Sequence, residues 1–300
     1  MFKSIITDQI SMDLEEALQV AKKHDYSFVE IHSLWGETIE NLTKEEVLKV
    51  QKLLKKYEMK VSCLATTIFF MCPLYEDYTL ESFNPKFITL NGNFESHIEG
   101  LKRASEISKM LDVPYVRVFP FRLPSNKKIV VDNEDIKLIT EKINIAVKTA
   151  EELDTTLVLE NCPHSHMPKG VMTKRVADSI KSKNLKLLWD VGNSFRAPID
   201  GIAPEYGNIT PYEELDLILP DIRHIHIKDY TVLQNGSSKE FNHITFGCGS
   251  IDFNKIFKKL NKGNYKYALS LESEVNYKDT IDSMINLQDL LAKVESEGQY

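Results

Sequence analysis

Four successive stretches of this sequence share one pattern, a short run of apolar and β-branched residues that stops at a carboxylate or an imidazole. The runs are 155–161, 185–190, 222–229 and 268–272, and their polar groups are Glu160, Asp190, His226 and Glu272. Such runs are typical of strands buried on both faces of a parallel sheet. One polar strand end would be ordinary, but four in series predict a shared site.

The rest of the chain alternates predicted strands and helices in the same way. Further strands are predicted at 2–7, 28–32, 60–65 and 114–119. Helices are predicted at 13–24, 43–58, 94–111, 133–153, 171–182, 211–219, 253–260 and 277–294. Eight such units predict an α/β fold, a single (β/α)8 TIM barrel whose site lies at the C-terminal strand ends. An open doubly wound sheet would need a glycine-rich turn after its first strand, and the sequence has none there.

Composition limits the class of protein and its partners. With 42% hydrophobic and 27% charged residues, the chain is an ordinary globular sequence, and no Gly/Ser linker divides it, so we expect one domain over 1–300. A net charge of -7 argues against nucleic-acid binding. No long apolar segment suggests a membrane partner, so a cytoplasmic location is expected. The four cysteines lack the spacing of a zinc site.

Strand parity predicts which side chains enter the barrel, because successive residues of a strand alternate between its two faces. Ile225 and Ile227 suit the outer, helix-covered face, which turns His226 inward. The same rule turns inward a larger polar set: Glu30, His32, Arg117, Glu160, Asp190, His224, Lys228 and Glu272. For Arg117 and Glu30 the sequence leaves two alternatives open, substrate binding or a mutual buried ion pair.

The chemistry of the four strand-end groups predicts a divalent metal site. Three carboxylates and one imidazole are hard ligands that favour Mn²⁺ over a structural zinc, with Mg²⁺, Co²⁺ and Zn²⁺ as alternatives. About two positions would remain for neighbouring oxygens of a polyhydroxy carbonyl compound, which the ion would polarise. Glu160 and Glu272 come from different strands and can act as the catalytic acid/base pair, one taking a proton and the other returning it.

Several longer motifs carry a family resemblance. They are Leu159-Glu160-Asn161, Trp189-Asp190-Val191-Gly192, His224-Ile225-His226-Ile227-Lys228-Asp229, Phe246-Gly247-Cys248-Gly249-Ser250-Ile251-Asp252-Phe253 and Leu271-Glu272. The chain resembles the xylose-isomerase-like barrel superfamily of sugar isomerases and epimerases, which also includes endonuclease IV and inosose dehydratase. The resemblance implies that Glu160, Asp190, His226 and Glu272 bind a divalent metal and that the two glutamates handle the proton.

The remaining candidate residues are predicted to bind substrate. Asn193 replaces the histidine of many relatives and can hydrogen-bond a hydroxyl, but it is a poor ligand for a second metal. Lys228 resembles a family lysine that can bind a hydroxyl or phosphate, and its alternative role is a charge partner for Asp229 or Glu272. His164 and His166 either contact substrate or are exposed loop histidines. The full substrate-binding set is Asn193, Lys228, His32, Glu30, Arg117 and His166.

These features favour a metal-dependent isomerase or epimerase of a small sugar, sugar phosphate or polyol, acting through an enediolate. A dehydratase of a cyclic keto-polyol is the alternative, because it needs only a differently placed acid. An endonuclease IV-like nuclease is less favoured, because it would need three metals and a basic groove. Asn193 and the net charge of -7 argue against both. A small carbohydrate is therefore the expected partner, and a homo-oligomer is compatible with the sequence. The aromatic loop 66–93 contains Phe69, Phe70, Tyr75, Tyr78 and Phe83. These residues are expected to cover the barrel mouth, and the alternative is that they pack against the third helix.

Overall fold

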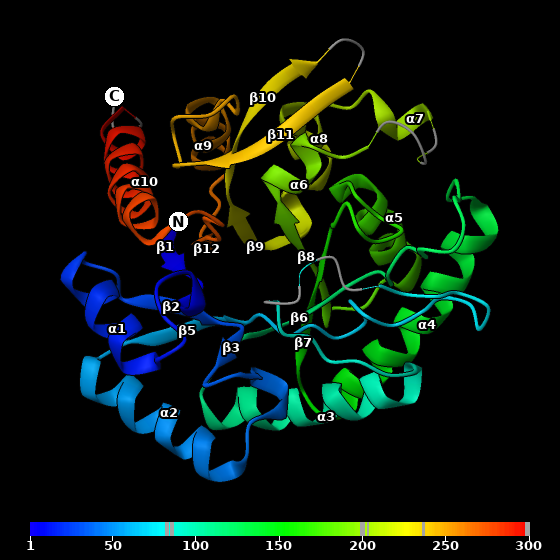
Figure 1. Cartoon of the computed structure of the whole chain (residues 1–300), viewed down its shortest axis with the longest axis horizontal. Coiled ribbons are helices and arrows are strands. Elements are labelled where there is room, and N and C mark those ends of the chain that lie inside the picture. Colours follow the sequence, from blue (N-terminus) through cyan, green and yellow to red (C-terminus); the bar gives the residue numbers. More distant parts are fainter. Residues whose placement is uncertain (82–83, 85–86, 199–201, 203, 236–237, 298–300) are drawn as a thin grey trace.

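Eight parallel strands form one sheet in this computed structural model, which describes residues 1–81, 84, 87–198, 202, 204–235 and 238–297. The strands are β1 (Phe2–Ile5), β2 (Phe28–Ile31), β5 (Lys60–Leu64), β6 (Tyr115–Val118), β7 (Thr156–Glu160), β8 (Leu185–Asp190), β9 (Ile222–Ile227) and β12 (Ala268–Leu271). Their order in the sheet is β1-β12-β9-β8-β7-β6-β5-β2, so neighbours in the sheet follow one another along the chain, except that the first strand, β1, pairs with the last, β12. This is the predicted TIM barrel (Figure 1).

The two ends of the sheet meet at one backbone bridge. Ile6, just after β1, pairs in parallel with Glu30 of β2. The pairing between β5 and β6 is also short, with Leu64 and Val116 as its register pair. The backbone of Glu30 thus closes the barrel, and its side chain lies in the interior with an exposed fraction of 0%.

Helices follow the strands and surround them (Figure 1). They are α1 (Leu14–Lys23), α2 (Lys44–Tyr57), α3 (Phe94–Met110), α4 (Asn133–Glu152), α5 (Gly170–Ile180), α6 (Val191–Phe195), α7 (Pro204–Gly207), α8 (Pro211–Ile218), α9 (Phe253–Lys262) and α10 (Tyr277–Glu297). Side-chain caps define the first residues of several helices. Asp13 accepts from the backbone N–H of Glu16 at the start of α1, and Thr43 and Glu46 form a capping box at the start of α2. No described helix is long and apolar enough to cross a membrane.

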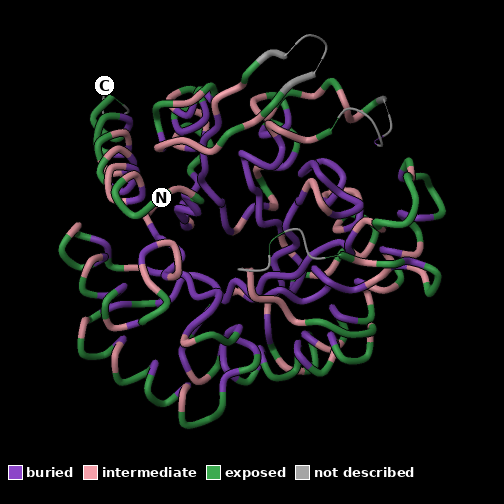
Figure 2. The backbone as a smooth tube through the Cα atoms, viewed as in Figure 1, coloured by how far each residue is buried: buried purple, intermediate pink, exposed green. Residues whose placement is uncertain are grey.

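The barrel strands are largely buried (purple in Figure 2), and their apolar residues fall into separate clusters. Leu157, Leu159 and Trp189 belong to the large cluster that the helices cover. Val158 and Leu188 pack with Cys63 in a separate small cluster. Because adjacent residues of one strand fall into different clusters, the predicted alternation of faces is confirmed for β7 and β8. The strand ends above these apolar interior residues carry the polar groups.

Two pairs of antiparallel strands were not predicted. β3 (Ser33–Leu34) pairs with β4 (Glu37–Thr38), and β10 (Asp229–Asn235) pairs with β11 (Ser238–Ile244). The longer ribbon extends from the C-terminal end of β9, with Asp229 opposite Ile244 (Figure 1). The Asn235-Gly236 dipeptide of the sequence is a strong hairpin signal that the strand assignment did not use.

The aromatic loop divides between the core and the barrel mouth. Phe69 is fully buried and stacks on Phe94 of α3, and the Tyr75 hydroxyl donates to Asp135 of α4. Phe70 instead packs edge-on against Phe119, above the strand ends. Phe83 lies outside the described residues. The prediction that these aromatics cover the site together is therefore wrong for Phe69 and Tyr75.

Candidate active site

A cavity of about 660 Å³ lies at the C-terminal ends of the strands. Its lining includes polar groups from many segments and a few apolar ones: Asp8, Gln9, His32, Ser33, Phe70, Phe87, Arg117, Phe119, Glu160, His164, Asn193, Arg196, Lys228, His243, Glu272 and Glu274. Another cavity, of about 460 Å³, is lined by Phe2, Phe28, Met59 and Tyr267 from the N-terminal side of the barrel and lacks this polar set. The cavity that contains the candidate site residues therefore lies at the C-terminal strand ends, as the sequence predicts.

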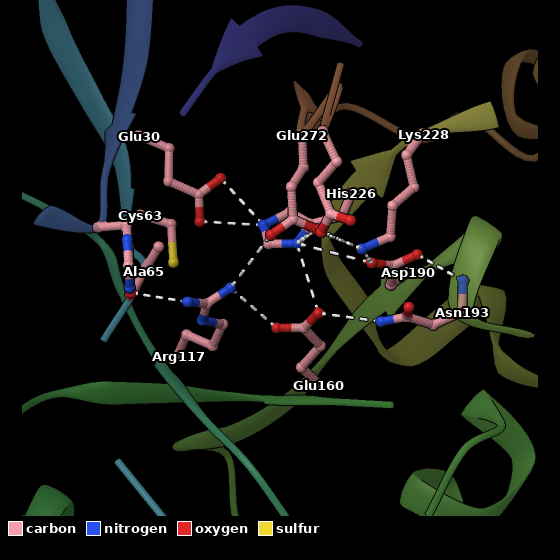
Figure 3. A network of polar contacts seen from close by, with 12 residues as sticks. Glu30, Cys63, Ala65, Arg117, Glu160, Asp190, Asn193, His226, Lys228 and Glu272 are labelled. Carbon is pink, nitrogen blue, oxygen red and sulfur yellow. Dashed lines mark hydrogen bonds and ion pairs between the residues drawn. The ribbon is translucent and has the colours of Figure 1, made fainter. Parts of the chain in front are cut away.

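The four predicted metal ligands converge at the floor of the larger cavity (Figure 3). One ligand atom from each of Glu160, Asp190, His226 and Glu272 can be chosen so that all four lie within 4.8 Å of one another. His226 Nδ1 is 3.5 Å from both Glu160 Oε1 and Glu272 Oε2, and 4.0 Å from Asp190 Oδ2. All four residues are buried. The strand ends thus bring together the set that the sequence indicated.

Glu30 holds the opposite edge of the His226 ring. His226 Nε2 lies 3.1 Å from both Glu30 oxygens, and His224 Nε2 lies 2.8 Å from Glu30 Oε2. Although burial opposes it, the two histidines hold the pKa of Glu30 well below its usual range. An ionised carboxylate can only accept hydrogen bonds, so both Nε2 atoms donate. Burial opposes it, but Glu30, Glu272 and Glu160 raise the pKa of His226 well above its usual value. Loss of the Nδ1 proton would leave a lone pair that faces the carboxylates, the arrangement common for metal-binding histidines.

Lys228 links two of the carboxylates. Its Nζ lies 2.6 Å from Glu272 Oε2 and 2.9 Å from Asp190 Oδ2. Burial alone would raise the pKa of Glu272, but Lys228 and His226 hold it well below its usual range. For Asp190, burial outweighs Lys228, and with the nearby carboxylates it raises the pKa to about 7. Lys228 therefore holds Glu272 in its ionised form but does not do the same for Asp190.

The donor set fits a divalent cation. Among the described residues, His226 Nδ1 and Asp190 Oδ2 are buried without a hydrogen-bond partner, although Lys228 lies near Asp190. Buried polar atoms left without partners are costly and uncommon. A cation between the four side chains would satisfy both atoms. It would also offset the charge repulsion that raises the pKa of Asp190.

Arg117 and Asn193 orient Glu160 from two sides. Arg117 Nη1 lies 3.0 Å from Glu160 Oε2 and 4.0 Å from Glu272 Oε1, while its other nitrogens donate to backbone carbonyls. Asn193 Nδ2 lies 3.4 Å from Glu160 Oε1. Arg117 pairs with Glu160 while Glu30 pairs with the histidines, so the alternative of an Arg117–Glu30 pair is wrong. Both Arg117 and Asn193 line the cavity.

The other predicted substrate residues divide between the cavity and the core. His32 and Lys228 line the cavity, whereas Glu30 lies outside its lining, behind His226. His166 is fully buried, its ring pairing with the Phe121 carbonyl and stacking on Tyr78. The alternative that His166 is an exposed loop residue is therefore wrong. It lies outside the cavity lining, because the loop after β7 folds back into the core.

Sequence reasoning missed several polar residues of the cavity lining: Asp8, Gln9, Ser33, Arg196, His243 and Glu274. Asp8 Oδ2 lies 2.6 Å from His32 Nδ1 and accepts from the Ser33 hydroxyl. Glu274 lies 2.8 Å from His243 of β11. Asp8 directly follows the first strand predicted from the sequence, 2–7, so the same strand-end signal would have found it. The ribbon histidine required the β10–β11 hairpin to be recognised first.

Asp229 explains the long motif before α9. Its carboxylate accepts from the backbone N–H groups of Gly247, Gly249 and Ile251. A Cβ on Gly249 would lie 2.2 Å from Asp229 Oδ1, so only glycine permits this close approach. Of the two charge partners suggested for Lys228, the structure therefore has Glu272. Asp229 instead binds the backbone of the loop before α9.

Comparison with curated proteins gives relatives with sugar-like substrates in their names. The chain is 26% identical over 211 residues to the putative L-ribulose-5-phosphate 3-epimerase SgbU of Haemophilus influenzae, which covers 68% of each chain. It is 28% identical over 156 residues to an inosose dehydratase of Klebsiella pneumoniae, covering 47% of this chain and 48% of that protein. The relatives are thus epimerases and dehydratases.

Solved structures and a family model agree on the fold. A D-tagatose 3-epimerase-like protein superposes with a TM-score of 0.70 at 20% identity over 99% of both chains. The IOLI protein with a bound zinc atom gives 0.70 at 16% identity over 98% of this chain and 99% of that one. A Mycobacterium smegmatis barrel protein in complex with magnesium gives 0.67 at 12% identity over 93% and 88%. Since the family model matches residues 18–290, this chain belongs to the xylose isomerase-like TIM barrel family.

Proposed function

We propose that the protein is a metal-dependent isomerase or epimerase of a small sugar, sugar phosphate or polyol, acting by proton transfer through an enediolate. The observation that carries this proposal is the placement of Glu160 and Glu272. Both belong to the candidate ligand set, both line the cavity, and they reach it from different strands. Two such carboxylates can address the two faces of one substrate carbon.

The metal in this proposal is Mn²⁺, because three carboxylates and one imidazole form a hard ligand set. Zn²⁺ and Mg²⁺ remain alternatives, since solved relatives carry these ions. When bound by Glu160, Asp190, His226 and Glu272, the ion would polarise a substrate carbonyl and so acidify the adjacent C–H.

The side chains around the cluster have distinct parts in this chemistry. One glutamate accepts the proton from the carbon beside the carbonyl, and the other returns a proton to the enediolate. Arg117 fixes Glu160 and approaches Glu272, so it maintains the separation of the pair. Lys228 keeps Glu272 ionised, the state required of a base. Asn193 contributes an amide beside Glu160.

Unpartnered polar atoms in the cavity support a substrate rich in hydroxyls. Among the described residues, buried atoms without hydrogen-bond partners include His32 Nε2, Asn193 Oδ1, Arg196 Nε and His243 Nδ1, and all four residues line the cavity. Such groups bind best to a ligand that supplies the missing donors and acceptors. A polyhydroxylated compound does so, whereas an apolar ligand would leave them unsatisfied.

The Asp8–His32 pair favours a dehydratase as the second candidate function. Asp8 fixes the His32 ring through Nδ1, which leaves Nε2 buried, unpartnered among the described residues and on the cavity wall. Loss of a hydroxyl from the carbon beside an enediolate needs a proton donor in addition to the base. A protonated His32 can supply that proton, and the departing hydroxyl leaves as water.

A substrate screen with isotope readout tests the proposal. Ketoses, inososes and their phosphates would be incubated with the Mn²⁺-loaded protein in deuterated water and examined by NMR. We expect one of them to exchange a carbon-bound proton and to give an isomer or epimer. An unsaturated product would select the dehydratase, and absence of exchange in every compound would overturn both functions.

A prediction concerns Glu30, which contacts no substrate in this proposal. In Glu30→Gln the amide offers one acceptor oxygen to two histidine N–H donors, so the His226 ring loses its fixed orientation. We expect Mn²⁺ affinity, measured by titration, to fall about 10- to 100-fold, as for other outer partners of metal ligands. The matched control Glu99→Gln, in an exposed pair with Lys102, should bind Mn²⁺ as the wild type does. Equal affinity in Glu30→Gln would contradict the role.

A further inference from the structure

The cations that line the cavity differ in whether a carboxylate neutralises them. Arg117 pairs with Glu160, and Lys228 pairs with Asp190 and Glu272. Of the histidines in the cavity lining, His32 lies beside Asp8 and His243 lies beside Glu274. Arg196 lines the same cavity and forms no ion pair with any described residue. The cavity thus has one arginine whose charge the described side chains leave uncompensated.

Contacts hold the Arg196 side chain in place but leave part of its hydrogen-bonding capacity unused. Its guanidinium lies 5.5 Å from the centre of the Tyr230 ring, and its Nη2 lies 3.5 Å from His164 Nε2. Its Nε is buried and has no hydrogen-bond partner among the described residues. An arginine presents its donors in a planar fork that suits oxyanions. A fixed fork with a free buried donor is prepared for an anionic ligand.

The pKa of the neighbouring His164 reflects the positive charges around this part of the cavity wall. His164 also lines the cavity. Burial, followed by Arg196, Arg122 and Lys228, lowers the pKa of His164 to about 4. His164 is therefore neutral near pH 7, and its Nε2 can accept from Arg196. A neutral imidazole in this position adds no negative charge that would compete with an oxyanion for Arg196.

Helix α6 relates Arg196 to the metal cluster. Asp190 caps the helix by accepting from the backbone N–H of Asn193, and Arg196 is its C-terminal cap. Residues three apart share a helix face, so the ligand Asp190, the amide of Asn193 and the guanidinium of Arg196 follow one another along one side. Six residues rise about 9 Å along a helix axis. Arg196 is thus placed for the end of a substrate remote from its carbonyl.

We propose that Arg196, assisted by His164, forms an oxyanion subsite, so that the substrate is a sugar derivative with an anionic group at the end opposite its reacting carbonyl. This inference rests on the proposed function, and it narrows the substrate class. The group is a phosphate ester or a carboxylate, since a guanidinium fork binds either. Neutral sugars would bind without engaging Arg196.

The test compares charged and neutral ligands of one chain length. Calorimetry of the Mn²⁺-loaded protein would give dissociation constants for D-fructose 6-phosphate, D-fructose and D-fructuronate, which share a six-carbon chain with the carbonyl at C2 and differ at C6. We expect the wild type to prefer a charged ligand over the neutral ketose, and Arg196→Gln to reduce that preference about 10- to 100-fold while neutral binding is kept. Arg175→Gln is the matched control. Arg175 contacts Tyr206 and Asn133, also has no acidic partner among the described residues, and lies outside the cavity lining.

Each outcome decides the proposal. Preference for the phosphate identifies a phosphate ester, and preference for D-fructuronate identifies a carboxylate, provided that Arg196→Gln abolishes it. Equal binding of all three ligands, or a preference that survives Arg196→Gln, would overturn the subsite. Mn²⁺ affinity should be unchanged in Arg196→Gln. If the preference depends on Arg196 but no ketose or inosose exchanges a proton, the subsite stands and the proposed catalysis fails.

Discussion

Glu160→Gln and Glu272→Gln should each lower turnover by about 10² to 10⁴, the usual effect of removing a general acid or base. Glutamine keeps an oxygen near the other ligands and near Arg117, but its amide cannot take up the substrate proton. Mn²⁺ affinity should therefore fall less than turnover does. Steady-state rates and metal titration of the same preparations give the comparison, and Glu99→Gln on α3 should match the wild type.

Isotope distribution separates this two-glutamate route from a hydride shift. A proton held by a carboxylate exchanges with water, so the wild type should place solvent deuterium at the reacting carbon. The variant that lacks the first base should lose exchange together with turnover. Full retention of the substrate label by an active wild type would refute the glutamate pair and leave the metal cluster unaffected.

The barrel and the convergence of the four candidate ligands could be predicted because both follow from local patterns. Alternation along β7 and β8 assigns Val158 and Leu188 to the interior and Leu157 and Trp189 to the helix-covered face. Strand ends of a parallel barrel meet at one rim, so polar residues at those ends converge whatever the length of the connections.

Contacts across the barrel could not be predicted in the same way. Parity turned both Glu30 and Arg117 inward, but parity does not say which inward groups face each other. The closure of the barrel at Ile6 and Glu30 places Glu30 opposite the histidines of β9, and Arg117 is left to pair with Glu160. These partners depend on the closed geometry of the whole sheet.

The positions of loop residues could not be predicted either. The sequence suggests His166 as a substrate contact or an exposed residue, yet the segment after β7 folds inward and buries it against Tyr78. His243 reaches the cavity because the β10–β11 ribbon extends from the rim, and Arg196 reaches it because α6 begins directly at Asp190. Each placement depends on a short element that strand-helix periodicity does not resolve.

His226→Ala should abolish the metal site. The substitution removes a ligand atom and leaves Glu160, Asp190 and Glu272 without the imidazole between them, while Glu30 loses one of its two histidine partners. We expect Mn²⁺ affinity to fall by more than the 10- to 100-fold typical of outer partners. Titration followed by elemental analysis measures this loss, and His24→Ala, at the end of α1, is the control.

A buried alanine cavity could also weaken folding, so a second variant is needed to isolate the ligand effect. Asp190→Asn keeps the size of the side chain and one oxygen, but it removes the charge that burial and the neighbouring carboxylates already oppose. The metal-free variant should therefore fold at least as well as the metal-free wild type, since less charge repulsion remains in the cluster. Its Mn²⁺ affinity should nevertheless fall, because a neutral amide is a weaker ligand than a carboxylate. Folding unchanged by circular dichroism together with wild-type Mn²⁺ affinity in both variants would place the ion elsewhere.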